Sequence, residues 1–131
     1  MSNSIVIDHY VVDDLIKGNA YARRLVHGAL GGEGLRVWIP RYVFVELLDS
    51  NDSLAALLMG LEQMFPGRLM TGLDGPAYLR AIRNFSEPLR IKDPFAIATA
   101  FDAIGLKAPI VTSNPDCYTW LTDVEVYSYG S

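Results

Sequence analysis

The sequence predicts an α/β protein in which helices cover both faces of a parallel sheet. Short apolar runs typical of buried strands alternate with longer segments whose apolar residues recur at helical spacing. This alternation favours a parallel sheet, because each crossover helix packs back onto the strands. The 131 residues fit a single domain, residues 1–131, and 50% of them are hydrophobic, which is enough to form a core without disulfides.

In the first half of the chain we expect strands at residues 4–8 and 35–39 and helices at residues 11–17, 19–30, 42–48 and 52–65. Asn19 is a suitable N-cap for the second of these helices, and Pro40 suits the first turn of the third. Apolar residues lie on more than one side of the helix at 52–65. Its surplus apolar surface predicts a homodimer or a groove for a partner protein.

In the second half we expect a weak strand at residues 68–71, a helix at 74–85, and strands at 109–112 and 124–127. The clearest helix begins at Asp93-Pro94, a good pair for an N-cap and first helical position, and is expected to end at Gly105. Helical spacing places Phe95, Ala98, Phe101 and Ile104 on its inner side. We expect Asp102 to lie on its exposed side.

Composition and charge exclude several classes of protein. One cysteine, Cys117, permits no internal disulfide, and with His9 and His27 it leaves too few soft ligands for a structural zinc site. The N-terminal residues lack the features of a signal peptide, and no segment has the ~20 apolar residues of a membrane span, so a cytoplasmic protein is expected. The net charge of −4 argues against a broad basic surface, although one local basic strip contains Arg80, Arg83, Arg90 and Lys92.

Four acidic residues are candidates for a common site at the carboxyl edge of the sheet, where ligands of open parallel sheets bind. They are Asp8 at the end of the first strand, Glu46 in the third helix, Asp93 at the start of the clearest helix, and Asp116 after the strand at 109–112. Clustered carboxylates repel one another, and a divalent cation removes that repulsion. Oxygen ligands of this kind favour Mg²⁺ or Mn²⁺ over zinc.

Each acid also has an explanation without a metal. Asp93 could simply be a helix cap, Asp116 a turn residue, and Asp8 the polar end of a strand. Glu46 interrupts the apolar run at 42–48, where a carboxylate needs a partner or an ion unless it occupies the one solvated position of its helix.

The order of these motifs resembles the PIN-domain family, particularly the VapC-type toxins of prokaryotic toxin–antitoxin pairs. The resemblance spans nearly the whole chain and rests on IVID ending in Asp8, IPRYVFVELL with Glu46, KDPFAIATAFDAIGLKAPIVTSNPD with Asp93 and Asp116, and the closing VEVYSY. It implies a three-layer α/β/α sandwich around a parallel sheet of four to five strands. It also implies Mg²⁺ or Mn²⁺ bound by Asp8, Glu46 and Asp93, cleavage of RNA, and an antitoxin partner.

Two positions depart from the family pattern. His9-Tyr10 follow the first Asp where the family has a small hydroxyl or amide residue, and Asn114 stands where a family acid is often found. Asp116, or Asn114 through a water, would then complete the metal site. The leading hypothesis is an endoribonuclease that uses water as the nucleophile. The residues of the basic strip are candidates to bind the RNA backbone. The alternative is a catalytically degenerate PIN-like module that binds a protein partner or RNA.

Overall fold

The computed structural model describes residues 3–32, 34–50, 52–72 and 93–129. Its elements in chain order are β1 (Ser4–Ile7), α1 (His9–Ile16), α2 (Ala20–His27), the π-helical turn η1 (Gly28–Gly32), β2 (Arg36–Ile39), α3 (Arg41–Ser50), α4 (Asp52–Met64), β3 (Leu69–Thr71), α6 (Pro94–Leu106), β4 (Ile110–Thr112), the 3-10 turn η2 (Pro115–Tyr118) and β5 (Val126–Ser128). The helix expected at 74–85 and the basic strip from Arg80 to Lys92 lie outside the described residues.

The sheet has five strands in the order β3-β2-β1-β4-β5, and all neighbouring strands are parallel. The chain therefore moves outward from β1 through β2 to β3 and then crosses to the other side of β1 to form β4. This reversal places a topological switch point at the carboxyl ends of β1 and β4, where open parallel sheets bind their ligands. The expected parallel sheet is confirmed, including the weak third strand.

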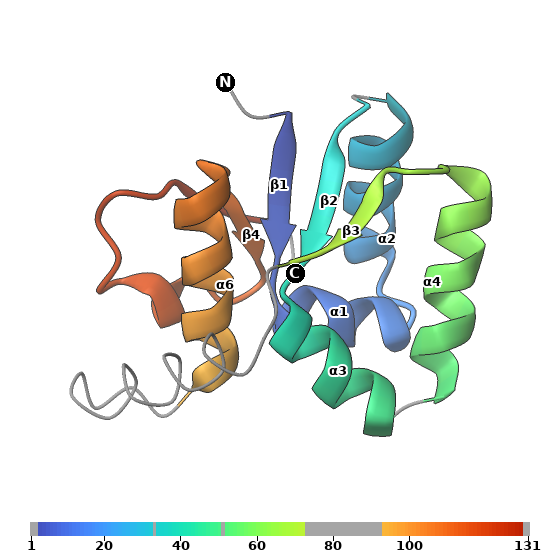
Figure 1. The fold of residues 1–131 in the computed structure, drawn as a ribbon, viewed down its shortest axis with the longest axis horizontal. Helices are drawn as coiled ribbons and strands as arrows, with labels where there is room; N and C mark the ends of the chain where they lie inside the picture. The colour runs from blue at the N-terminus through green and yellow to red at the C-terminus, as the bar shows by residue number, and fades with distance from the viewer. Residues whose placement is uncertain (1–2, 33, 51, 73–92, 130–131) are drawn as a thin grey trace.

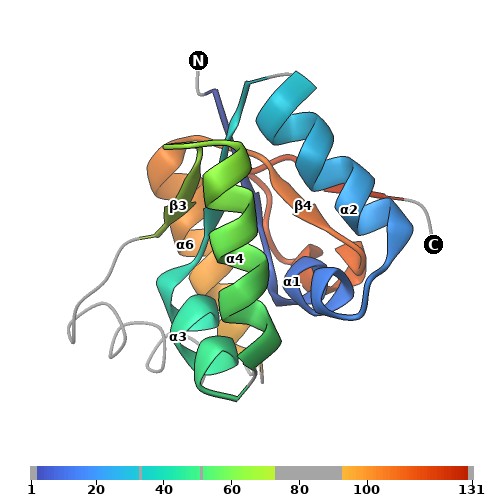
Figure 2. The same cartoon turned by 90° about the vertical axis from the view of Figure 1, so that its right-hand side faces the viewer.

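Alternating side chains of the strands form a core on each face of the sheet. Ile5, Ile7, Val37 and Ile39 face one side, where apolar residues of α1, α2, α3 and α4 cover them. Val6 and Ile110 face the other side and pack with α6 and the segment after β4. Figures 1 and 2 show α6 separated from α2 and α4 by the sheet, which gives three layers. No helix in the described ranges is long and apolar enough to cross a membrane.

The orientation of α6 differs from the expectation at two residues. Asp102 is 1% exposed and not on the solvent side, whereas Ile104, expected inside, is 52% exposed. The helix is apolar around most of its circumference, so spacing alone could not identify the inward face. Gly72, directly after β3, provides the space for Asp102, because a Cβ atom there would lie only 1.8 Å from Oδ2 of Asp102.

The ends of some helices and strands differ slightly from those expected from the sequence. Helix α6 continues through Gly105 to Leu106 and ends at Lys107, whose left-handed conformation closes the last turn. The helix expected at 19–30 is shorter: α2 ends at His27, because the chain continues as the π-helical turn η1. The last strand lies two residues later than its expected start. The Asn19 cap is confirmed, since its Oδ1 accepts a hydrogen bond from the backbone N–H of Ala22 at 3.0 Å.

Candidate functional site

Asp8 lies at the switch point, between the end of β1 and the start of α1. Its side chain is fully buried. Oδ1 accepts a hydrogen bond from the backbone N–H of Val11 at 3.1 Å, and Oδ2 accepts one from the Tyr118 hydroxyl at 2.7 Å. Burial raises the pKa of Asp8, although hydrogen bonds from Thr112, Tyr118 and Val11 oppose the rise. The site therefore contains a carboxylate whose negative charge is shielded from water.

Asp93 is the N-cap of α6, as its sequence context predicted. Its Oδ1 accepts hydrogen bonds from the backbone N–H groups of Phe95 at 3.0 Å and Ala96 at 3.3 Å. Its Oδ2 lies 3.1 Å from Nε2 of His9. Burial acts to raise the pKa of Asp93, but the hydrogen bond and charge of His9 and the two backbone donors outweigh it, so the pKa is lowered. The residue serves as a helix cap and also takes part in a side-chain cluster.

His9 connects the two acids. It directly follows Asp8 in the chain and donates to Asp93 across the site. Its ring lies 4.2 Å from that of Tyr10 and 5.0 Å from that of Phe95, measured between centroids. Within the described part of the chain its buried Nδ1 atom has no hydrogen-bond partner. The cluster thus retains one polar atom whose bonding capacity is unused.

Tyr118 is a member of the site that the sequence reasoning missed. It lies on the turn η2, is 2% exposed, and donates its hydroxyl hydrogen to Asp8. Burial, reinforced by the neighbouring Asp8 charge, raises the pKa of Tyr118, so the phenol stays protonated and remains a donor. The same turn is attached to α1 by a second contact, in which the Tyr10 hydroxyl lies 3.3 Å from Sγ of Cys117. The sequence offered one signal for this residue: an aromatic side chain that closely follows the loop at 113–116.

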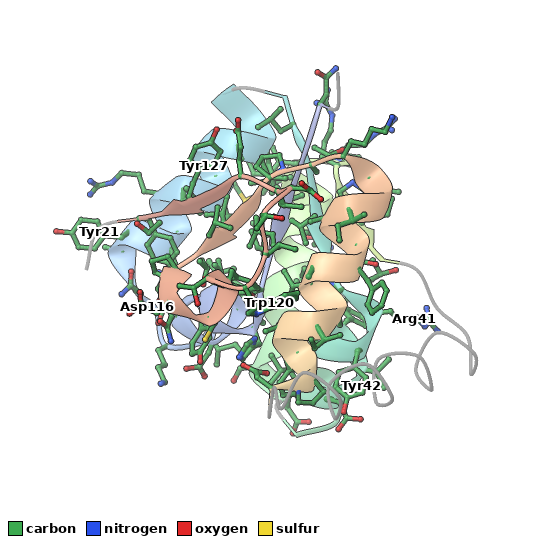
Figure 3. All side chains as sticks on the ribbon, turned by 90° about the vertical axis from the view of Figure 1, so that its left-hand side faces the viewer. Tyr21, Arg41, Tyr42, Asp116, Trp120 and Tyr127 are labelled. Carbon is green, nitrogen blue, oxygen red and sulfur yellow. The ribbon has the colours of Figure 1, made fainter. Side chains whose placement is uncertain are left out.

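The other sequence candidates occupy more open positions. Glu46 is exposed on α3, one turn beyond Tyr42, whose ring centroid is 5.2 Å from that of Phe95 at the start of α6. Residues one turn apart share a helix face, so Glu46 lies on the side of α3 that approaches α6. Asp116 is exposed on η2, as Figure 3 shows, and Asn114 is half-buried just before that turn.

In the described residues His9, which follows Asp8, contacts Asp93, and Tyr118 donates a hydrogen bond to Asp8. They include no group of three or more His, Cys, Asp or Glu side chains arranged to hold a metal ion. By chemistry, the oxygen donors suit a hard cation such as Mg²⁺ or Mn²⁺, and a buried carboxylate with a raised pKa is a group that a cation would stabilise. A bound ion would therefore need Glu46, Asn114 or Asp116 as further ligands.

Three solved structures are similar to this chain over nearly its whole length. VapBC2 from Rickettsia felis, bound to a DNA fragment from the promoter, has a TM-score of 0.66 and 17% identity and covers 97% of this chain and 99% of its own. DNA-bound VapBC from Salmonella typhimurium has a TM-score of 0.64 and 16% identity, covering 98% of both chains. FitAcB from Neisseria gonorrhoeae has a TM-score of 0.55 and 19% identity, covering 94% and 96%.

The chain has a PIN-like fold. The resemblance inferred from the sequence motifs is confirmed at this level, with five parallel strands between helical layers. No protein-family model and no curated protein sequence matches the chain. At identities of 16% to 19% the similarity concerns the fold, which by itself does not determine the chemistry of the site.

Proposed function

We propose that this chain is a metal-dependent endoribonuclease that hydrolyses RNA phosphodiester bonds, acting in the cytoplasm as the toxin of a toxin–antitoxin pair. The observation that carries the proposal is the buried Asp8 at the switch point of a PIN-like fold, with Asp93 linked to it through His9, the residue that follows Asp8. Acidic residues at that position of a parallel sheet are suited to cation-assisted chemistry on phosphates.

Mg²⁺ or Mn²⁺ is the expected cofactor. Asp8 and Asp93 would hold it, Glu46 would join them from α3, and Asp116, or Asn114 through a water, would complete the site. When bound, the ion would lower the pKa of a water molecule and offset negative charge on the phosphate that is attacked.

The chain's own residues would prepare this site before the ion arrives. The Tyr118 hydroxyl and the Val11 N–H fix both oxygens of Asp8, so the carboxylate cannot rotate freely. His9 fixes Oδ2 of Asp93 while the first turn of α6 fixes Oδ1. Such fixed geometry reduces the reorganisation needed when a phosphate binds. Basic residues would then hold the RNA backbone, and the candidates are Arg80, Arg83, Arg90 and Lys92.

An antitoxin and a second copy of the chain are the expected protein partners. The similar VapBC and FitAcB structures suggest the first. Helix α4 supports a protein interface, because Leu54, Leu58 and Leu61 are buried while Met59 and Met64 remain 64% and 59% exposed. Exposed apolar side chains of this size favour contact with another protein surface.

One observation favours a second candidate function, a degenerate PIN-like module that binds a protein or RNA without cleaving it. Both oxygens of Asp8 and both oxygens of Asp93 already accept hydrogen bonds from the protein. These hydrogen-bond donors partly compensate the negative charges of the two carboxylates, as a bound cation would. Asn114, which is neutral, replaces the acid often found at its position in the family.

A cleavage assay separates the two functions. Purified protein is incubated with a mixed RNA pool in Mn²⁺ and in EDTA, with Asp8→Asn as the test variant and Asp123→Asn, an exposed acid, as the matched control. The proposal expects cleavage only with metal, a rate reduced by roughly a hundredfold or more in Asp8→Asn, and an unchanged rate in the control. Cleavage that persists in EDTA, or at an equal rate in Asp8→Asn, would refute it. RNA or protein binding without cleavage would support the module.

A further inference from the structure

A polar cleft lies at the opposite end of the sheet from the acids. It has a volume of about 680 Å³ and is lined by residues from the starts of β1 and β2, the turn before β3 and the end of α6. Figure 1 shows these segments at one end of the molecule and α3 at the other. Because a four-residue strand spans about 13 Å, the cleft is separate from the Asp8–Asp93 pair.

Two arginines and an indole define the chemistry of this cleft. Arg36 and Trp38 point to the same face of β2, since they are two residues apart in one strand, and Arg68 reaches the cleft from the turn before β3. The described residues that line the cleft include no carboxylate. The nearby Glu62 carboxylate accepts a hydrogen bond from the backbone N–H of Gly67. Among the described residues that line the cleft, the charged side chains are therefore those of Arg36 and Arg68.

Two of these side chains are already held in place. Arg68 donates from Nη1 to the carbonyl oxygen of Gly34. Gly34 has φ +65, and a Cβ atom there would lie 2.9 Å from Nη1, so glycine allows the guanidinium to lie against the backbone. Trp38 donates from Nε1 to Oγ of Ser4 at 3.1 Å. A guanidinium has five N–H donors, so the bond to Gly34 uses one of those that Arg68 offers.

We propose that this cleft binds a phosphate ester carried by a nucleoside, with Arg36 and Arg68 on the phosphate and Trp38 beside the base. Arginine forks match phosphate oxygens, and an indole offers a surface on which a base can stack. The ligand is either a free mononucleotide or the phosphorylated end of an RNA strand, which share this chemistry. The site does not depend on cleavage at the acids.

Calorimetric titration in EDTA tests the site without cleavage. The probes are 5′-AMP, adenosine as the ligand without phosphate, and a short oligoribonucleotide with and without a 5′-phosphate. We expect 5′-AMP to bind at least tenfold more tightly than adenosine. Arg36→Gln and Arg68→Gln should each weaken binding of 5′-AMP by about tenfold, the scale of one charged hydrogen bond. Arg24→Gln, an exposed arginine on α2 outside the cleft, should not change it.

Arg36→Gln is the cleaner variant, because Arg68 also holds the Gly34 turn. A thermal melt of each variant distinguishes lost binding from lost fold. Tighter binding of the 5′-phosphorylated oligoribonucleotide than of 5′-AMP would identify RNA as the ligand. Equal binding of the two would identify a mononucleotide as the ligand. The proposal is overturned if 5′-AMP does not bind at millimolar concentration, binds no better than adenosine, or binds folded Arg36→Gln as well as the parent. RNA cleavage by Arg36→Gln at the parental rate would leave the proposed nuclease function intact.

Discussion

The two ends of the sheet hold their charges in opposite ways. At the carboxyl end Asp8 is fully buried and both of its oxygens accept hydrogen bonds from the protein. At the amino end Arg36 and Arg68 are exposed around an open cleft. A buried charge has to be compensated within the fold, whereas an exposed charge is compensated by water or by a ligand. Substitutions at the carboxyl end should therefore change stability, and those at the amino end should change binding.

The largest expected effect is a loss of stability on substitution of Gly72, which is compared with Gly67 near the other end of β3. Gly72→Ala would place a Cβ atom 1.8 Å from Oδ2 of the buried Asp102, whereas an added Cβ at Gly67, with φ +76, meets no atom within 4 Å. We expect Gly72→Ala to lower the free energy of unfolding by about 3 kcal/mol through overpacking. Gly67→Ala should cost about 1 to 2 kcal/mol from backbone strain alone. Urea denaturation measures both, and a larger loss for Gly67→Ala would contradict the comparison.

Removing the Tyr118 hydroxyl should have the next largest effect. Tyr118→Phe keeps the ring but leaves Oδ2 of Asp8 without its 2.7 Å donor, which should cost about 2 kcal/mol, typical of a hydrogen bond to a charged group. Added Mn²⁺ should recover more stability in Tyr118→Phe than in the parent, because the cation can use the oxygen that is freed. Tyr127→Phe is the control: it removes a hydrogen bond from an exposed tyrosine to Glu125, which water can replace, so the melting temperature should change little. Equal melting temperatures for the two variants would show that the buried hydrogen bond has no net value.

The smallest expected effect is a pH dependence of opposite sign for the two acids. The pKa of Asp8 is raised above 3.8, so the folded state binds its proton more tightly and this contribution to stability falls as pH rises from 3.8 through the folded pKa. The pKa of Asp93 is lowered, so its contribution is present above 3.8 and is lost as pH falls through the folded pKa. Asp8→Asn should remove the first trend and Asp93→Asn the second. Denaturation in EDTA across this pH range measures both, and trends of the same sign would refute the assignments.

Local sequence signals predicted the elements that carry the acids. The apolar run before Asp8 identified β1, and Asp93-Pro94 identified the start of α6, because each signal involves neighbouring residues. Tyr118 was missed because its hydrogen bond joins residues 110 positions apart, which no local pattern reveals. Asp102 was misplaced because α6 is apolar on most sides. The amino-end cleft was missed because Arg36 and Arg68 come together only when β2 and β3 pair.

Binding of Mn²⁺ at the carboxyl end of the sheet most directly tests the central claim, that Asp8 and Asp93 form a cation site. Calorimetric titration of the parent with Mn²⁺ should show binding, and saturation at 100 times the dissociation constant should add about 2.7 kcal/mol to the free energy of unfolding. Asp8→Asn should lose this binding while the exposed Asp123→Asn retains it. Absence of binding by the folded parent at millimolar Mn²⁺, or equal binding by Asp8→Asn, would contradict the claim that Asp8 and Asp93 form a cation site.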